Sequence, residues 1–210
     1  FLGAAADKME GDLQNTGGPL GGLIADAQLA ATAPAGAQVA FMNPFGVRRS
    51  LVPAADHSLT FGDIYAVQPF NNDLMTLTYT GAELKAVLEQ GFDDAGPEQI
   101  LTPSAGFAYS YDRARPVGDR IVAMTLNGEP IAPERSYRVT VSNFLANGGD
   151  TYAGFTKGRD RTVGPSDIAA LEAWLKAVPP RLPPQEARHT DLNPELNRTR
   201  STAPPGIKYR

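Results

Sequence analysis

A strand pattern that runs directly into a glycine-containing turn is the feature of this sequence that most restricts its fold. Residues 137–141 have β-type character, and residues 142–150 read Ser-Asn-Phe-Leu-Ala-Asn-Gly-Gly-Asp. Adjacent glycines let the backbone adopt positive φ and let a ligand approach closely. Phe144 offers a flat ring, and Asp150 offers two acceptor oxygens that suit a vicinal diol. The same run is also ordinary turn chemistry, so the choice between turn and ligand site depends on the segments upstream.

The composition is that of a globular chain with an ordinary hydrophobic core. Hydrophobic residues make up 42% and charged residues 20% of the 210 residues. The net charge of −4 argues against a nucleic-acid partner bound by phosphate neutralisation. No apolar run approaches the roughly 20 residues that span a bilayer. The first seven residues also lack the basic start and apolar stretch of a signal peptide, so we expect a mature chain or a fragment.

The sequence offers few residues for catalysis. Cysteine is absent, which excludes disulfides, thiolate metal sites and cysteine nucleophiles. Neither His57 nor His189 has a metal-ligand spacing, and we interpret both as surface histidines. Nucleophile-elbow and phosphate-loop motifs are missing. We therefore expect neither a catalytic residue nor a metal or other cofactor in this chain.

Hydrophobic periodicity predicts a mixed order of helices and strands. Helices are predicted at 19–32, at 81–92 behind a capping-box spacing, and at 167–178 behind Ser166, with a short helical or turn segment at 59–67. Strands are predicted at 38–42, 73–79, 107–111, 121–126 and 136–141, and the pair Asn127-Gly128 predicts a type I′ hairpin turn. Because helices and strands do not alternate strictly, the expected class is α+β, with helices packed in layers on a mixed sheet.

The two ends of the chain differ in character from its middle. Residues 1–17 are polar with glycine and are predicted to be a linker, and residues 18–178 form the domain. Seven of the 18 prolines fall in the stretch 179–210, which is predicted to be an extended tail. That tail either wraps the domain, contacts a partner or lies on the surface without a function.

A polar loop follows the predicted strand at 38–42. It reads Asn-Pro-Phe-Gly-Val-Arg over residues 43–48, so an amide and a guanidinium emerge at the end of a strand, where ligands often bind. Asn43 offers a donor and an acceptor, and Arg48 is able to grip a phosphate or carboxylate. Since neighbouring side chains of an extended segment point to opposite sides, either Arg48 or Arg49 faces the site.

Two further segments that precede predicted strands carry candidate binding residues, Phe70 and Gly106. Residues 68–72 read Gln-Pro-Phe-Asn-Asn, and the proline restrains the backbone that carries Phe70. Residues 104–106 read Ser-Ala-Gly, a glycine at the entry of a strand. Taken alone, Phe70 is better explained by core or loop packing than by ligand binding.

Six segments in this order resemble a known family. They are residues 20–27 (Leu-Gly-Gly-Leu-Ile-Ala-Asp-Ala), 43–48, 69–72, 80–84, 126–128 and 143–150. Together they resemble the C-terminal domain of the 5′-nucleotidase family, which includes UDP-sugar hydrolases and 2′,3′-cyclic-nucleotide phosphodiesterases. The resemblance implies a domain that binds the base and ribose of a nucleotide. It also implies a separate N-terminal metallophosphatase domain with two divalent metals, to which residues 1–17 would connect.

The resemblance assigns roles to residues at matching positions. Phe70 and Phe144 match the two rings that clamp the base, and Asp150 matches the carboxylate that faces the ribose hydroxyls. Stacking on aromatic rings tolerates many bases, so broad base specificity is expected.

The loop at 43–48 matches the family's Asn-x-Gly-Gly-Ile-Arg loop with one departure. Asn43, Gly46 and Arg48 match its amide, second glycine and arginine, and Gly106 matches a glycine near the base. Phe45 stands where the family has the first loop glycine, and this bulk would narrow or reshape the pocket. A further arginine at the end of the family's first helix has no counterpart in residues 29–32, so the grip on a phosphate is expected to be weaker.

The resulting hypothesis is a substrate-binding domain of a periplasmic or secreted 5′-nucleotidase-like hydrolase. Its partners would be a nucleotide or nucleoside and the metallophosphatase domain of the same protein. One alternative is the same domain of a sulfur-oxidation thiosulfohydrolase, although a sulfur ester has no base for two phenylalanines to stack on. The other alternative is a nucleotide- or ligand-binding module that has no catalytic partner.

Overall fold

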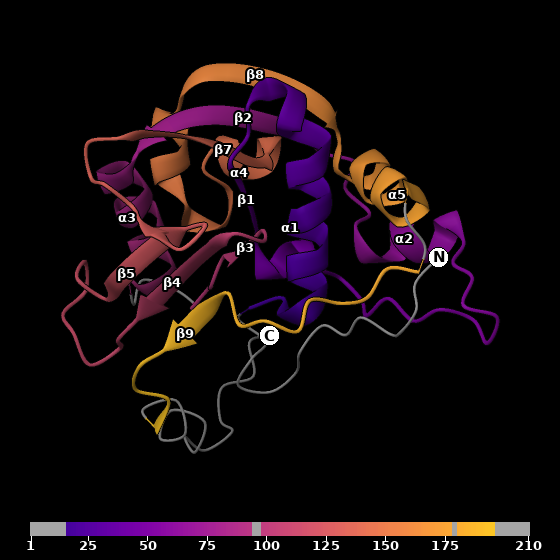
Figure 1. The fold of residues 1–210 in the computed structure, drawn as a ribbon, viewed down its shortest axis with the longest axis horizontal. Helices are drawn as coiled ribbons and strands as arrows, with labels where there is room; N and C mark the ends of the chain where they lie inside the picture. Colours follow the sequence, from indigo (N-terminus) through magenta and orange to yellow (C-terminus); the bar gives the residue numbers. More distant parts are fainter. Residues whose placement is uncertain (1–15, 94–97, 178–179, 196–210) are drawn as a thin grey trace, which may run out of the picture.

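The computed structural model describes residues 16–93, 98–177 and 180–195, which fold into two sheets with helices packed around them (Figure 1). The larger sheet has the order β3-β1-β7-β2-β8, formed by β1 (Val39–Met42), β2 (Asp73–Thr80), β3 (Thr102–Pro103), β7 (Ser136–Ser142) and β8 (Arg159–Ser166). The smaller sheet has the order β6-β5-β4-β9, formed by β4 (Phe107–Tyr111), β5 (Ile121–Leu126), β6 (Glu129–Pro130) and β9 (His189–Asp191). The helices are α1 (Gly18–Thr32), α2 (Phe61–Val67), α3 (Gly81–Glu89), α4 (Asn143–Ala146) and α5 (Asp167–Ala177).

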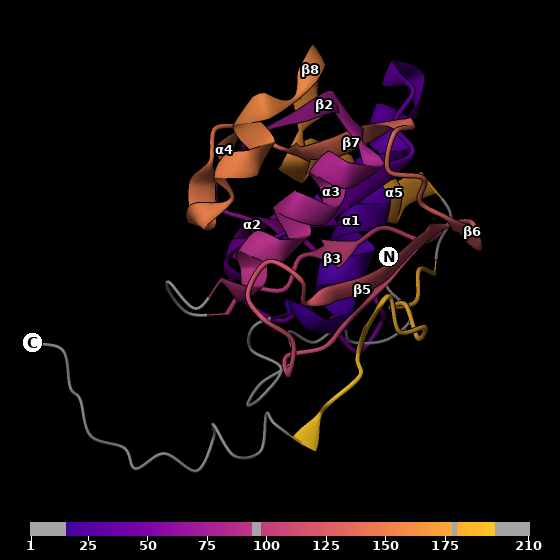
Figure 2. The same ribbon diagram turned by 90° about the vertical axis from the view of Figure 1, so that its left-hand side faces the viewer.

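Strand β7 lies at the centre of the larger sheet and fixes its mixed character (Figure 2). It runs parallel to β1, with Val39 opposite Val139, and antiparallel to β2, with Thr76 opposite Thr140. In this arrangement β1 and β7 end, and β2 begins, at the same edge of the sheet. The loops that follow β1 and β7 and precede β2 therefore meet there, which confirms the expected α+β class with a mixed sheet.

The two faces of the larger sheet bury two separate cores. One face packs against α3 and the smaller sheet, and its cluster includes Phe41, Leu77 and Val139. The opposite face packs against α1, which stands in Figure 1 between the sheet and the pair α2 and α5. Because side chains alternate along a strand, odd-numbered residues of β2 and β7 face the first core, and even-numbered residues face α1. On the α1 side, the hydroxyls of Thr32, Thr76 and Thr140 are hydrogen-bonded to one another in a chain.

Local signals determine where the helices begin. The predicted capping box of α3 is present, because the Thr80 hydroxyl accepts from the Glu83 N–H and the Glu83 carboxylate accepts from the Thr80 N–H. A second capping box joins Thr60 and Asp63 at the start of α2. The predicted type I′ turn is also confirmed, since Asn127 and Gly128 have φ of 53° and 83°.

Among the elements that differ from the sequence-based expectation are α4, β8 and β9. Residues 143–146, expected as part of a turn, form the short helix α4, and edge strand β8 was not expected. β8 pairs with β2 in an irregular register and is largely exposed. Because it buries no face, its sequence lacks the alternation of apolar and polar residues by which a strand is predicted. The third element is β9, which lies within the predicted tail. Val178, predicted on the face of the last helix, lies outside the described residues, as do residues 1–15 of the predicted linker.

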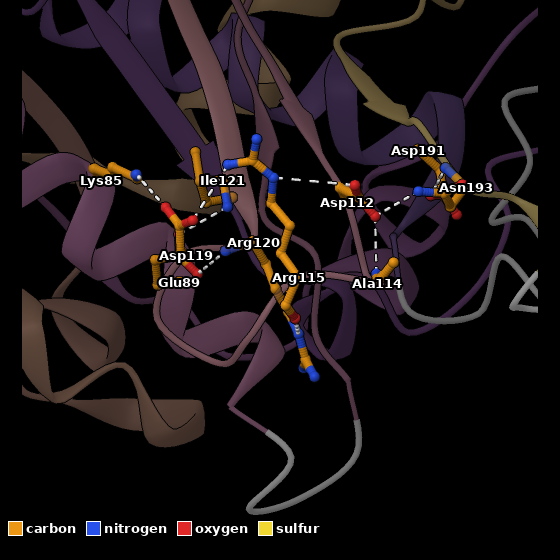
Figure 3. Close-up of polar contacts among 10 residues, drawn as sticks. All are labelled: Lys85, Glu89, Asp112, Ala114, Arg115, Asp119, Arg120, Ile121, Asp191 and Asn193. Carbon is orange, nitrogen blue, oxygen red and sulfur yellow. Dashed lines mark hydrogen bonds and ion pairs between the residues drawn. The ribbon is translucent and has the colours of Figure 1, made fainter.

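The described part of the tail wraps the domain. Strand β9 runs parallel to β4 and becomes an edge of the smaller sheet. Arg188, just before it, is buried and makes a two-pronged ion pair with Asp26 of α1 at 2.7 and 2.9 Å. Beyond it, Asn193 donates to the Asp112 carboxylate at 2.5 Å, a contact drawn in Figure 3. Of the three possibilities left open for the tail, residues 180–195 therefore follow the first.

The interpretation of His189 as a surface histidine is wrong. The ring lies half-buried against Tyr109 and Tyr111, with centroids at 6.0 and 6.5 Å. Burial, helped by the positive charge of Arg113, lowers the pKa of His189 to about 4. Sequence context did not reveal this, because the residues around His189 are polar and the burying rings come from β4. His57 is exposed, as expected.

Candidate functional site

A cavity of about 220 Å³ opens at the edge of the larger sheet where β1 and β7 end. Residues from α1, the β1–α2 loop, the α2–β2 loop, the segment after β7 and the start of α5 line it. Six of the seven residues predicted for substrate binding are among them: Asn43, Gly46, Arg48, Phe70, Phe144 and Asp150. The fold therefore brings together side chains that are up to 107 positions apart in the sequence.

The loop after β1 forms a tight turn that faces the cavity. Pro44–Gly46 make one 3-10 turn, and the Arg48 N–H donates to the Val67 carbonyl at 2.9 Å, which holds this loop against the end of α2. A Cβ on Gly46 would lie 2.5 Å from Met42 Cε and 2.7 Å from Asn43 Oδ1. Gly46 thus lets the turn close over Asn43, and a larger residue there would displace both neighbours.

Arg48 and Phe70 form one wall of the cavity. The Phe70 ring is 48% exposed, and the Arg48 guanidinium lies 5.8 Å from the centre of that ring, a cation–π contact. Arg49 is exposed and does not line the cavity. The alternation argument that separated Arg48 from Arg49 thus agrees with the geometry.

Phe144 stands on the opposite segment, after β7. Ser142 accepts from the Leu145 N–H and starts α4, so Phe144 lies in its first turn with 45% of the residue exposed. Gly148 has φ of 87°, and a Cβ on Gly149 would come within 2.5 Å of the Phe144 ring. The two glycines therefore serve different purposes: Gly148 reverses the chain, and Gly149 leaves space for the ring.

Asp150 is held by Asn43 rather than by its own turn. The Asn43 amide donates to Asp150 Oδ2 at 2.6 Å, and Asn43 is 5% exposed. Asp150 has φ of 52°, an unusual backbone conformation for a non-glycine residue. The Asp150 carbonyl also accepts from the Gln99 side chain at 3.2 Å. These contacts place the carboxylate at the cavity, and within the described part of the chain the Asn43 bond is made to Oδ2 and not to Oδ1.

Gly106 is the predicted residue that the structure does not bring to this cavity. It has φ of 89° at the entry of β4, and its carbonyl accepts from the Asn127 N–H at 2.6 Å. A Cβ there would meet Asn127 Oδ1 at 2.5 Å, so the glycine is needed for close packing against the β5–β6 turn.

Seven further residues line the cavity and were not among those predicted: Gln28, Met42, Phe45, Gln68, Asn72, Ser142 and Asp167. Phe45, at the departure from the family loop, is 37% exposed and adds a third aromatic ring to the lining. Asp167 is buried, and this burial raises the pKa of its carboxyl. No sequence signal pointed to Asp167, because it lies on a helix far from the recognised motifs. Gln28 directly follows the segment 20–27, but that segment indicated only a helix and assigned no role to Gln28.

The described residues contain no group of three or more His, Asp or Glu placed to hold a metal ion. They also include no helix long and apolar enough to cross a membrane. The exposed rings and polar side chains of the cavity suit the binding and orientation of a planar, hydroxylated ligand.

Comparisons with known proteins agree with this geometry. Residues 3–157 match the model of the family described as "5′-nucleotidase, C-terminal domain". Endonuclease YhcR of Bacillus subtilis is 33% identical over 180 residues, which are 84% of this chain and 14% of that protein. The crystal structure of a 5′-nucleotidase precursor from Thermus thermophilus superposes with a TM-score of 0.75 at 35% identity, covering 83% of this chain and 35% of the other.

A more distant structure shares the fold alone. The sulfate thiohydrolase SoxB of Thermus thermophilus superposes with a TM-score of 0.70 at 18% identity, over 90% of this chain and 34% of the other. All three proteins are much longer than the part that this chain matches. By the match over residues 3–157, the chain belongs to the 5′-nucleotidase C-terminal domain family.

Proposed function

We propose that this chain is the substrate-binding domain of a 5′-nucleotidase-like phosphoesterase and that it binds the base and ribose of a nucleotide. The observation that carries the proposal is the convergence of two half-exposed rings, Phe70 and Phe144, with the Asp150 carboxylate and the Arg48 guanidinium at one cavity. These are the chemical groups that a nucleotide requires: aromatic faces, a diol acceptor and a cation.

Each group has a defined task in this proposal. The base stacks on Phe70 and Phe144, at about 1–3 kcal/mol per stacking contact. The ribose hydroxyls donate to Asp150, whose position is set by Asn43. Arg48 holds the 5′ substituent near the rim. Holding the nucleotide in this way would orient its phosphate for hydrolysis elsewhere in a full-length protein, where positioning contributes much of the rate.

The second candidate function is the same domain in a thiosulfohydrolase, and its support is the shared fold of SoxB. A sulfur ester offers nothing planar to the two exposed rings, so the cavity favours the nucleotide. The third candidate is a ligand-binding module without hydrolase activity. We further propose that the intact protein is periplasmic or secreted, as the family resemblance implies, and that two divalent metals and the catalytic groups reside on its metallophosphatase domain.

Titration calorimetry of the purified chain with adenosine, AMP, UDP-glucose and thiosulfate tests the proposal. We expect heat of binding with the first three and none with thiosulfate. Binding of thiosulfate alone would support the second candidate and contradict the nucleotide. The chain by itself is not expected to release phosphate from AMP with added Mg²⁺ or Mn²⁺, and metal-dependent turnover would show that it contains catalytic groups of its own.

A further inference from the structure

The floor of the cavity contains a carboxylate and an amide that are linked twice. The Asp167 N–H donates to the Asn72 carbonyl at 2.8 Å, and the Asn72 side-chain amide donates back to Asp167 Oδ2 at 3.2 Å. Both residues line the cavity, yet they differ in exposure: Asp167 is 2% exposed, and Asn72 is half-buried and reachable. The buried Asp167 carboxyl group is thus hydrogen-bonded to an Asn72 amide that is accessible from the cavity.

The carboxylate determines which end of the Asn72 amide faces a ligand. An ionised carboxylate only accepts hydrogen bonds, so Asn72 must turn its NH₂ group toward Asp167. Asp167 cannot rotate away easily, because its Oδ1 accepts from the Ile168 N–H at 2.7 Å in the first turn of α5. The Asn72 oxygen then lies on the other side of the amide, and no hydrogen bond to it comes from the described residues.

Two more acceptors lie at the same floor. Gln28 and Gln68 are each 1% exposed, and both direct their amide nitrogen toward Met42 Sδ, at 3.6 and 3.9 Å. Their Oε1 atoms have no hydrogen-bond partner within the described part of the chain. A buried acceptor without a donor is unfavourable, so these two amides leave hydrogen-bonding capacity unused beside the Asn72–Asp167 pair.

We propose that Asp167 is a positioning residue that makes Asn72 an acceptor, so that the cavity selects bases carrying an exocyclic amino group. The inference rests on the proposed function, because it assigns the edge of the base to this floor. Adenine and cytosine present an amino donor at that edge. Hypoxanthine and uracil present a carbonyl oxygen there, which would meet the Asn72 oxygen as acceptor against acceptor.

The test compares adenosine with inosine, and cytidine with uridine, by calorimetry at pH 8, which lies well above the ordinary pKa of an aspartate carboxyl. We expect the wild-type chain to bind the amino-bearing member of each pair about ten-fold more tightly. In Asp167→Asn the new amide accepts from Ile168 and donates to Asn72, so Asn72 turns its NH₂ into the cavity. The preference should then vanish or reverse, while Glu172→Gln should keep it, because Glu172 does not line the cavity and pairs with the exposed Lys176 of α5.

The possible outcomes distinguish a failure of the inference about Asp167 and Asn72 from a failure of the proposed function. A ten-fold preference retained in folded Asp167→Asn overturns the inference. If that variant does not fold, Asn72→Leu removes the amide itself, and a preference that survives in Asn72→Leu overturns the inference equally. Equal binding of all four nucleosides by the wild type contradicts the inference and leaves the proposed function standing. Binding of no nucleoside by the wild type contradicts the proposed function itself.

Discussion

Two regions of this molecule combine arginine, carboxylates and aromatic rings with opposite results. At the cavity, Arg48 lies over Phe70, and both are exposed. At the junction of the tail with β4, Arg113 lies 4.8 Å from the centre of the Tyr111 ring, and both are buried.

The difference lies in how completely the charges are paired. Arg113 makes ion pairs with Glu98 and Asp191, whereas Arg48 has one long hydrogen bond, of 3.4 Å, to the Phe45 carbonyl. A fully paired cluster contributes to stability and has nothing left to offer a ligand. A sparsely paired cluster contributes little to stability and is available for binding. Substitutions at the two regions should therefore affect different measurements.

The largest effect is expected at the tail. Arg188→Met removes the buried partner of Asp26 and hydrogen bonds to the carbonyls of Gly22 and Pro103. Breaking a buried ion pair on one side costs about 3–5 kcal/mol of unfolding free energy. Urea unfolding should show this loss, and exposed Arg49→Met should change stability by less than about 0.5 kcal/mol. Equal stability of the two variants would mean that the tail is not an integral part of the fold.

The second effect is a pH dependence of stability at the same region. Burial lowers the pKa of His189 to about 4 from an ordinary 6.5, so between these values the unfolded chain takes up a proton that the folded chain does not. The free energy of unfolding should therefore be highest above pH 6.5 and fall as the pH decreases. Near pH 4 it should be lower by about 3 kcal/mol. Unfolding free energies at pH 7, 5 and 4 should fall more steeply in the wild type than in His189→Gln. Parallel pH profiles would argue against burial of the ring.

At the cavity, Asp150→Ala should change selectivity. If Asp150 accepts from the ribose hydroxyls, adenosine should bind more tightly than 2′,3′-dideoxyadenosine by about 1.5–3 kcal/mol. Asp150→Ala should erase most of that difference, and Glu134→Ala, at an exposed carboxylate outside the cavity, should not. A preference that persists in Asp150→Ala, together with lower stability, would show that the carboxylate only supports the turn through Asn43.

Phe144→Ala should weaken adenosine binding by about 1–3 kcal/mol through loss of stacking. Since the residue is 45% exposed, the unfolding free energy should hardly change. Phe61→Ala is the matched control, because Phe61 is 55% exposed and does not line the cavity. Similar affinities for the two variants, measured by calorimetry, would remove Phe144 from the proposed clamp.

The smallest effect concerns Arg48. Its guanidinium is exposed, so its interaction with a 5′-phosphate should be worth about 0.2–1 kcal/mol. Arg48→Ala should lower the affinity for AMP by that amount relative to adenosine, and Arg49→Ala should not. Equal losses in both variants would contradict the assignment of Arg48 to the cavity.

The sequence predicted the parts of the site whose signals are local. The Asn43–Arg48 loop, Phe70 and the segment from Phe144 to Asp150 each follow or precede a recognisable strand, and through the family resemblance they were predicted to share one site. Asp167 was not, because its contact with Asn72 spans 95 residues and depends on how α5 docks. Gly106 resembled a ligand-side glycine, but its positive φ serves the packing against Asn127.

The contacts of the tail also could not be predicted from local sequence patterns. Proline-rich composition predicted an extended chain over 179–210, and an extended chain is also what the edge strand β9 requires. Nothing near Arg188 in the sequence indicates that Asp26, 162 residues earlier, is its partner. Pairing over such distances is set by the assembled sheet and is not visible in local patterns.

The central claim is that a nucleoside lies between Phe70 and Phe144 with its diol on Asp150, and a crystal structure of the chain with saturating adenosine tests it most directly. The account predicts adenine stacked between the two rings and at least one ribose hydroxyl within about 3.2 Å of the Asp150 carboxylate. Adenosine bound at another surface, or a cavity that stays free of it at saturation, would contradict the account.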